Sequence, residues 1–343
     1  MKEECSMNKK IRKGDFFMLL PSIIPIAVLF IAPLVYSLVL AFSNPVVNES
    51  GKAIYTDGQY EYFYNAKINR YDQMDEDRST GVVLKPFEIK SQTDVYKEVT
   101  DYGITNFKKF FSTKKYIITI WNTFKLVIPA AIIQFLLAFS MAYFLRGKIK
   151  GKLVYNTLII FPLTLGALII AAGMTNFFGA GGWFNSVLMT LGIIDKPIKI
   201  LYSYWGTFIS LIISGTPFLF SGFLPICEGI DPNLEIAAQT LGANPVKAFI
   251  KVFLPLAIPS LLSILSLNMV LNMATYPSAV LVGNPIGSTR LLAVAAFEEF
   301  QQNLNYNMAA TISLVLTASQ LLIIGVISAI RKKFYIGYGG SFK

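Results

Sequence analysis

The chain has 343 residues, of which 54% are hydrophobic and 15% charged, and its formal net charge is +10. The apolar residues come in long blocks, which is typical of membrane proteins rather than of soluble cores. The sequence has no histidine, which excludes His-based catalysis and His-dependent metal sites. Two cysteines do not make a disulfide framework. We expect neither a metal nor a cofactor.

Six segments are long and apolar enough to cross a bilayer, which takes about 20 mostly apolar residues. The first is too long for a cleaved signal peptide and lacks a small-x-small site after it, so we interpret it as a retained helix. The predicted fold is an all-α integral membrane protein with six transmembrane helices. In chain order they cover 16–42, 117–145, 153–178, 201–224, 256–282 and 308–330.

Lysine and arginine clusters beside these segments predict the orientation, because such residues favour the cytoplasmic side. The clusters all fall on one side if both termini are cytoplasmic. Their position also indicates contact with anionic lipid rather than nucleic acid. The predicted organisation is a cytoplasmic tail at 1–15, a first transmembrane helix at 16–42, an extracytoplasmic region at 43–115, a five-helix core domain at 116–330 and a cytoplasmic tail at 331–343.

The extracytoplasmic region contains short alternating runs that are typical of strands, namely YEYFY at 60–64 and VVLKPFEIK at 82–90. They predict a small insertion with some β structure. The insertion could contact a solute-binding partner, or it could cover and stabilise the spans.

The stretch between the fourth and fifth spans contains signals for two short helices. Asp231 and Pro232 suit a helix start, and Gly242 supplies a left-handed stop. The start signal recurs at Asn244, which predicts a second helix that ends at Leu254.

One side of the first short helix is built from small and medium-sized apolar residues. The two alanines there would let another protein surface approach the backbone closely. A helix lying on lipid would favour a strongly basic face and bulkier apolar residues. The pattern therefore favours a docking helix, with Leu234, Ala237, Ala238 and Leu241 on its contact side.

This stretch resembles the signature of the binding-protein-dependent permeases of type I ATP-binding cassette (ABC) importers. In that signature Glu-Ala-Ala is followed three residues later by Gly and, after nine more, by Ile-x-Leu-Pro. Ile236 stands where the family has glutamate, and Glu235 lies one residue earlier. The matching residues are Ala237, Ala238, Gly242, Val252, Leu254 and Pro255.

Two further motifs, WNTF at 121–124 and GAGGWFNSVLMTLGIID at 179–195, are similar to motifs of the same family. The resemblance implies a type I permease core and makes 228–255 the coupling segment that docks on a cytoplasmic ATPase. It also implies two ATP-binding subunits, a second permease subunit that is identical or different, an extracellular solute-binding protein, and location in the bacterial plasma (inner) membrane. The ATPase-coupling residues would be Asp231, Glu235, Ala237, Ala238, Gly242, Leu254 and Pro255.

The sequence has no G-x-x-x-x-G-K-[ST] motif for nucleotide phosphates, so an ATP-driven function needs a separate ATPase. The predicted function is a permease subunit, not an enzyme, that moves a small organic solute by alternating access. The alternative is a secondary transporter coupled to an ion gradient. That class commonly has carboxylates within its spans, and the six spans have no central Asp or Glu.

Four polar residues form a stripe in the fifth span and are candidates for the solute pathway. Hydrogen bonding between helices explains them equally well. Parts of the chain look like spermidine/putrescine permeases and parts like sugar permeases, so a polyamine, a sugar and a zwitterion all stay open. The candidate pathway residues are Asn268, Asn272, Thr275 and Tyr276.

Overall fold

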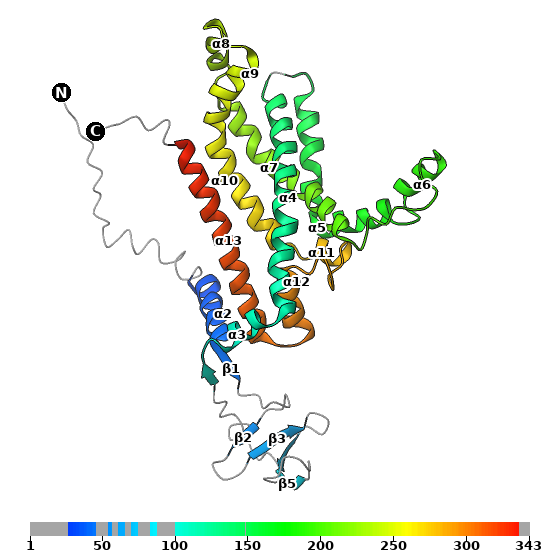
Figure 1. Cartoon of the computed structure of the whole chain (residues 1–343), viewed down its shortest axis with the longest axis vertical. Coiled ribbons are helices and arrows are strands. Elements are labelled where there is room, and N and C mark those ends of the chain that lie inside the picture. Colours follow the sequence, from blue (N-terminus) through cyan, green and yellow to red (C-terminus); the bar gives the residue numbers. More distant parts are fainter. Residues whose placement is uncertain are drawn as a thin grey trace, which may run out of the picture. The chain divides into compact units, whose positions relative to one another are not determined.

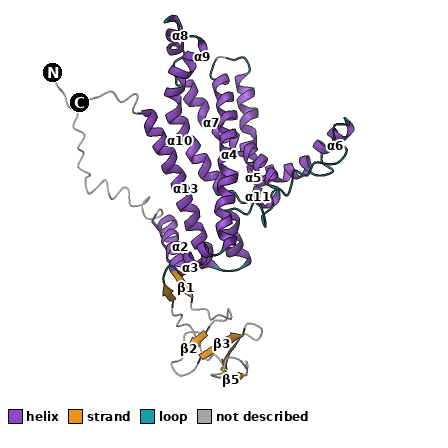
Figure 2. Ribbon diagram, in the orientation of Figure 1, coloured by secondary structure: helices purple, strands orange, loops and turns teal. Residues whose placement is uncertain are grey.

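The computed structural model describes residues 27–45, 54–56, 61–65, 70–74, 83–87, 100–147 and 149–335. The chain divides into two compact units. The first comprises residues 1–108 and 306–311, and the second comprises 109–305 and 312–343. Helices dominate the second unit (Figure 2).

The first unit contains the described part of the first predicted span. A π-helix, η1 (Ala27–Ile31), leads into α2 (Ala32–Phe42), whereas residues 16–26 of the prediction lie outside the described residues. β1 (Ser43–Pro45) then pairs antiparallel with β6 (Thr100–Tyr102). The Asn307 side chain donates to the Ser43 carbonyl at 2.5 Å and thereby ties the start of α13 (Tyr306–Tyr335) to this unit.

Four short strands form an antiparallel sheet in the order β2-β3-β4-β5. The register places Tyr62 opposite Gln73. The run at 60–64 overlaps β3 and the run at 82–90 contains β5, and the location of this region outside the cytoplasm stays a prediction. The strands are β2 (Ile54–Thr56), β3 (Glu61–Asn65), β4 (Arg70–Met74) and β5 (Val83–Phe87).

Five stretches of helix in the described residues are long and apolar enough to cross a membrane, and they coincide with the second to sixth predicted spans. α3 (Thr105–Ser112) precedes them. The helices are α4 (Lys114–Leu145), α5 (Lys152–Phe178) with α6 (Trp183–Thr190), α7 (Tyr204–Glu228), α9 (Pro245–Ala248) with η2 (Phe249–Phe253) and α10 (Leu254–Met273), and α13.

The core of the second unit lies around α7, which packs against α4, α5 and α10. Ala138 and Ala142 of α4 are fully buried beside Phe220 and Phe223 of α7. The small side chains of α4 thus leave room for the phenyl rings of α7, and the two backbones can lie close together.

The second short helix does not end at Leu254, contrary to the prediction. Pro255 has no N–H to donate to the Lys251 carbonyl. The chain forms the π-helix η2 before this proline, and the helix is not interrupted. The backbone N–H of Leu254 reaches back five residues to the Phe249 carbonyl. Helix therefore continues from Pro245 to Met273.

The fifth predicted span, 256–282, is not one continuous helix. α10 ends at Met273, and the short helix α11 (Pro277–Leu281) begins after a break. Pro277 cannot donate to the Met273 carbonyl, which removes the hydrogen bond that would continue the ladder.

In the segment 283–307 a short helix packs into the bundle. This helix, α12 (Leu292–Phe297), is followed by η3 (Glu298–Gln302) and packs against α4. Leu292 and Ala295 are fully buried, and the Leu292 N–H donates to the Thr123 hydroxyl at 3.0 Å. The apolar run around Leu292 explains this burial.

Candidate functional site

The predicted coupling segment, 228–255, contains α8 (Asn233–Thr240), which lies with α9 at one end of the helix bundle (Figure 1). Asp231 accepts a hydrogen bond from the Asn233 N–H at 2.9 Å, as its role at a helix start requires. Gly242 has a φ of +94°, and the Ala243 N–H bonds to the Ala238 carbonyl. This is the left-handed helix end that the glycine predicted.

The face of α8 that the sequence marked for docking is mostly open. Leu234 is 46% exposed and Leu241 is 90% exposed, and Ala237 is exposed beside them. Ala238 is half-buried. The side of α8 predicted to dock is therefore accessible.

Glu235 points the other way and is buried. Its carboxylate receives two hydrogen bonds from Arg146 in the turn after α4, Nη2 to Oε2 at 2.6 Å and Nη1 to Oε1 at 3.2 Å. The Arg146 guanidinium lies 4.2 Å from the ring centre of Tyr143 and 4.5 Å from that of Phe253. Sequence analysis named no partner for Glu235 and missed this contact.

A second ion pair joins the α4–α5 connection to the end of α7. Lys152, at the start of α5, lies 2.6 Å from Glu228, the last residue of α7. Leu254 and Pro255 lie half-buried at the start of α10. The α4–α5 connection is thus bound by charge to both α7 and α8.

The polar stripe of the fifth span makes hydrogen bonds between helices. Asn268 and Asn272 both donate to Gln134 Oε1, at 2.7 and 2.9 Å. Gln134 in turn donates to the Leu211 carbonyl at 2.6 Å. Gly215 lies against this amide, where a β-carbon would come within 2.4 Å of Gln134 Nε2.

The same two asparagines and Thr275 also line a pocket of about 190 Å³ between α5, α7 and α10. Gly166 borders the pocket and breaks α5 with a φ of +73°, a conformation that favours glycine. The sequence analysis did not identify this kink, although a glycine four residues after Pro162 was a usable signal.

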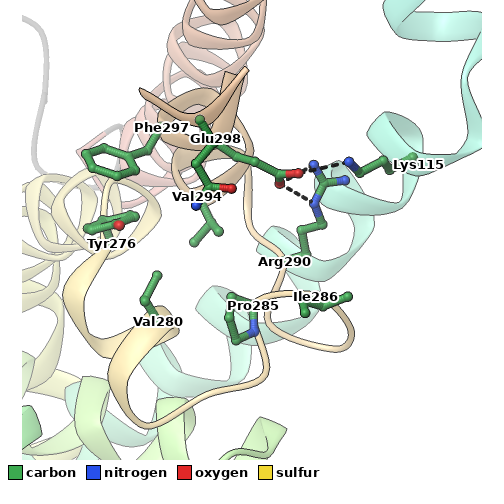
Figure 3. A pocket seen from close by; sticks show the side chains of 10 residues that line it. Lys115, Tyr276, Val280, Pro285, Ile286, Arg290, Val294, Phe297 and Glu298 are labelled. Atoms are coloured by element: carbon green, nitrogen blue, oxygen red, sulfur yellow. Dashed lines mark hydrogen bonds and ion pairs between the residues drawn. The ribbon is translucent and has the colours of Figure 1, made fainter. Parts of the chain in front are cut away.

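Tyr276 is not part of that pocket. It lines a second pocket of about 490 Å³ together with Phe297, whose ring centre lies 4.2 Å away. Figure 3 shows Arg290 and Lys115 pointing toward Glu298 at its edge. The four candidate pathway residues therefore divide between two pockets, and the break between α10 and α11 contributes Thr275 to one and Tyr276 to the other.

At the second pocket one carboxylate pairs with two cations. Arg290 donates from Nε and Nη2 to Glu298 Oε2 at 3.1 and 2.6 Å, and Lys115 donates to Oε1 at 2.9 Å. Burial raises the pKa of Glu298, but these hydrogen bonds and positive charges outweigh burial, so its pKa lies below the ordinary value. Glu298 is thus held as a carboxylate, and both of its oxygens already pair with the Arg290 and Lys115 side chains. Among the described residues, no group of three or more His, Cys, Asp or Glu side chains could hold a metal ion.

Comparisons with known proteins give one family. The model described as "Binding-protein-dependent transport system inner membrane component" matches residues 134–334, more than half of the chain. The chain is 30% identical over 227 residues to the spermidine/putrescine transport system permease protein PotB of Haemophilus influenzae, covering 65% of this chain and 77% of that protein. It is 25% identical over 207 residues to the sulfate transport system permease protein CysT of Salmonella typhimurium, covering 60% and 73%.

Solved structures show the same fold at low sequence identity. A bacterial ABC transporter involved in the import of the acidic polysaccharide alginate matches with a TM-score of 0.62 and 15% identity, covering 93% of this chain and 94% of that one. A bacterial alginate ABC transporter in complex with an alginate pentasaccharide-bound periplasmic protein matches with a TM-score of 0.60 and 19% identity, covering 67% and 83%.

Proposed function

The chain belongs to the family of inner membrane components of binding-protein-dependent transport systems, and from this premise we propose that it receives a small organic solute from an extracellular binding protein. It is a multi-pass membrane protein and a permease component of an ABC importer. The solute crosses by alternating access, and a separate ATPase supplies the energy. The assembly contains two ATP-binding subunits and a second permease subunit, identical or different.

The observation that carries this proposal is the exposed apolar face of α8 at the end of the bundle. Leu241 is 90% exposed on a helix whose start and stop are both fixed by hydrogen bonds. A short, rigid helix of this kind can fit a cleft of an ATPase and transmit the motion of that subunit to the spans. Asp231, Gly242 and Pro255 shape the segment, while Ala237 permits close approach.

The proposed orientation of the chain puts the docking face in the cytoplasm. The α4–α5 connection with Arg146 and Lys152 lies beside α8, so the basic residues there and the docking face are on one side. Because basic residues in short loops favour the cytoplasm, this side faces the cytoplasm and both termini lie there. The region 43–115 is then extracytoplasmic.

We place the solute pathway along the two pockets that the α10–α11 break lines with Thr275 and Tyr276. The larger pocket, with Tyr276, receives the solute, and the smaller one, with Asn268, Asn272 and Thr275, passes it inward. The residues that line the smaller pocket are amides, hydroxyls and apolar groups without a charge. Because an unpaired charge is costly there, a neutral hydroxyl-rich solute such as a sugar fits this pathway better than a polyamine.

The test is purification of the tagged chain with the ATPase and binding protein encoded beside its gene. We expect the ATPase to copurify, and ATP hydrolysis in proteoliposomes to rise when the binding protein carries its ligand. Transport of that ligand by the permease alone would contradict the proposal. The solute itself is identified by ligand binding to the purified binding protein.

A further inference from the structure

We propose that Tyr143, Arg146, Glu235 and Phe253 form a latch that makes α8 and the inner end of α4 move as one body. The proposal rests on the function above, in which α8 is displaced by an ATPase, and it assigns Arg146 and Glu235 a positioning role. The latch spans 89 positions of sequence between its two charged members.

Geometry makes this contact selective for arginine and carboxylate. Two parallel N–H···O bonds fix the planar guanidinium against the planar carboxylate, and a lysine ammonium cannot reproduce that fork. The Tyr143 and Phe253 rings add cation–π contacts from α4 and from η2. Three elements, α4, α8 and η2, therefore meet at one cation.

Burial makes the contact hard to open. The side chains of Arg146 and Glu235 are only 15% and 11% exposed. Separating them without full hydration would leave two poorly solvated charges, which costs more than parting a surface pair. A displacement of α8 therefore moves α4 with it and does not open a gap between the two helices.

The position of the glutamate determines which partner it meets. Successive residues on an α-helix point about 100° apart. Glu235 faces Arg146 of its own chain, whereas Ile236, at the position where the family signature has its glutamate, is 55% exposed. In this chain the carboxylate serves an internal contact, and an apolar side chain is offered outward.

The neighbouring pair Lys152–Glu228 provides a matched control. It joins the same connection to α7, but its side chains are 28% and 39% exposed. Exposed pairs hold helices together only weakly. Loss of this pair should leave α8 attached to α4.

The test measures the distance between spin labels at Gln239→Cys on α8 and Phe144→Cys in the last turn of α4, both exposed positions. The background carries Cys5→Ser, and Cys227 is buried. With the latch intact, in the transporter assembled with its ATPase, we expect one narrow distance distribution that ATP does not change. In Glu235→Gln and in Arg146→Lys the distribution should broaden and shift with ATP, whereas in Glu228→Gln, which leaves the turn around Arg146 intact, it should not.

An ATP-dependent distance change with the latch intact would overturn the proposal, as would a narrow, unchanging distribution in Glu235→Gln. Arg146→Lys keeps the charge, so its monodisperse purification separates loss of the latch from misfolding. If no ATPase subunit associates, the proposed function fails. The latch is then tested without nucleotide, by comparing the widths of the distance distributions in the intact protein and in Glu235→Gln. Equal widths would overturn the proposal.

Discussion

Glu235 receives both terminal nitrogens of Arg146, so a residue of the predicted docking helix is bound to the turn that follows α4. The docking helix α8 is therefore attached to the helix bundle. Its inner side is fixed to the bundle by charge, while Leu241 on its outer side is left open. This division between an anchored side and an open side is the basis for the role that we propose for α8.

Removing one partner of this pair should destabilise the protein markedly. We expect Arg146→Ala to cost about 3 kcal/mol, the lower end of the range for breaking a buried pair, because Glu235 then stays buried without its cation. Thermal unfolding in detergent measures the change. Lys152→Ala, at the exposed pair, should cost less than about 1 kcal/mol. Similar losses in the two variants would show that burial does not strengthen the Arg146 contact.

Replacement of Gly242 by valine should uncouple ATP hydrolysis from transport while the protein still inserts in the membrane. A β-branched residue at a φ of +94° is strained by about 1–2 kcal/mol, so the turn after α8 would rearrange. ATPase stimulation by the loaded binding protein is the readout. Gly147→Ala is the control, since that glycine has open space around it and no positive φ. Normal stimulation in Gly242→Val would argue against a rigid turn.

Gln134→Leu should destabilise the bundle by about 2 kcal/mol, the cost of leaving buried donors unpaired, because Asn268 and Asn272 both lose their acceptor. The midpoint of thermal unfolding should fall. The control is Thr157→Ala, which removes only an exposed hydroxyl bonded to its own helix. An unchanged midpoint in Gln134→Leu would mean that the two asparagines find other partners.

The ion pairs of Glu298 predict a pH dependence. Because its pKa is lowered in the folded state, Glu298 stabilises the protein above its ordinary pKa of 4.5, and this contribution disappears as the pH falls through the lower folded value. The difference in unfolding midpoint between wild type and Glu298→Gln should therefore be largest near neutral pH and shrink below about pH 4. A difference that grows on acidification would contradict the assignment.

The sequence predicted the long helices and the ends of α8 well, because these features depend on local properties. A run of about 20 apolar residues is sufficient to indicate a span, and Asp231 and Gly242 act on their nearest backbone groups. The partner of Glu235 could not be predicted in this way. Arg146 is 89 positions distant, and the contact exists only because α4 and α8 meet in the fold.

The remaining differences have the same physical origin. Pro255 and the apolar run around Leu292 are local signals for the π-helix and for the burial of α12, but which helices pack against these segments depends on how neighbouring helices fill space. The role of Asn268 was left open between a pathway and an interhelical hydrogen bond, and the structure shows that it both bonds to Gln134 and borders a pocket. A single polar stripe does not reveal which helix lies opposite.

The most direct test of the account is photo-crosslinking from Leu241, the most exposed residue of the docking surface, in cells that express the neighbouring ATPase. We expect a photoreactive amino acid at this position to crosslink to the ATPase subunit, and the same amino acid at Trp183, which is 67% exposed on α6, to give no such product. Labelling of a Leu241→Cys variant in intact cells by a membrane-impermeant thiol reagent, without any crosslink to the ATPase, would contradict the account.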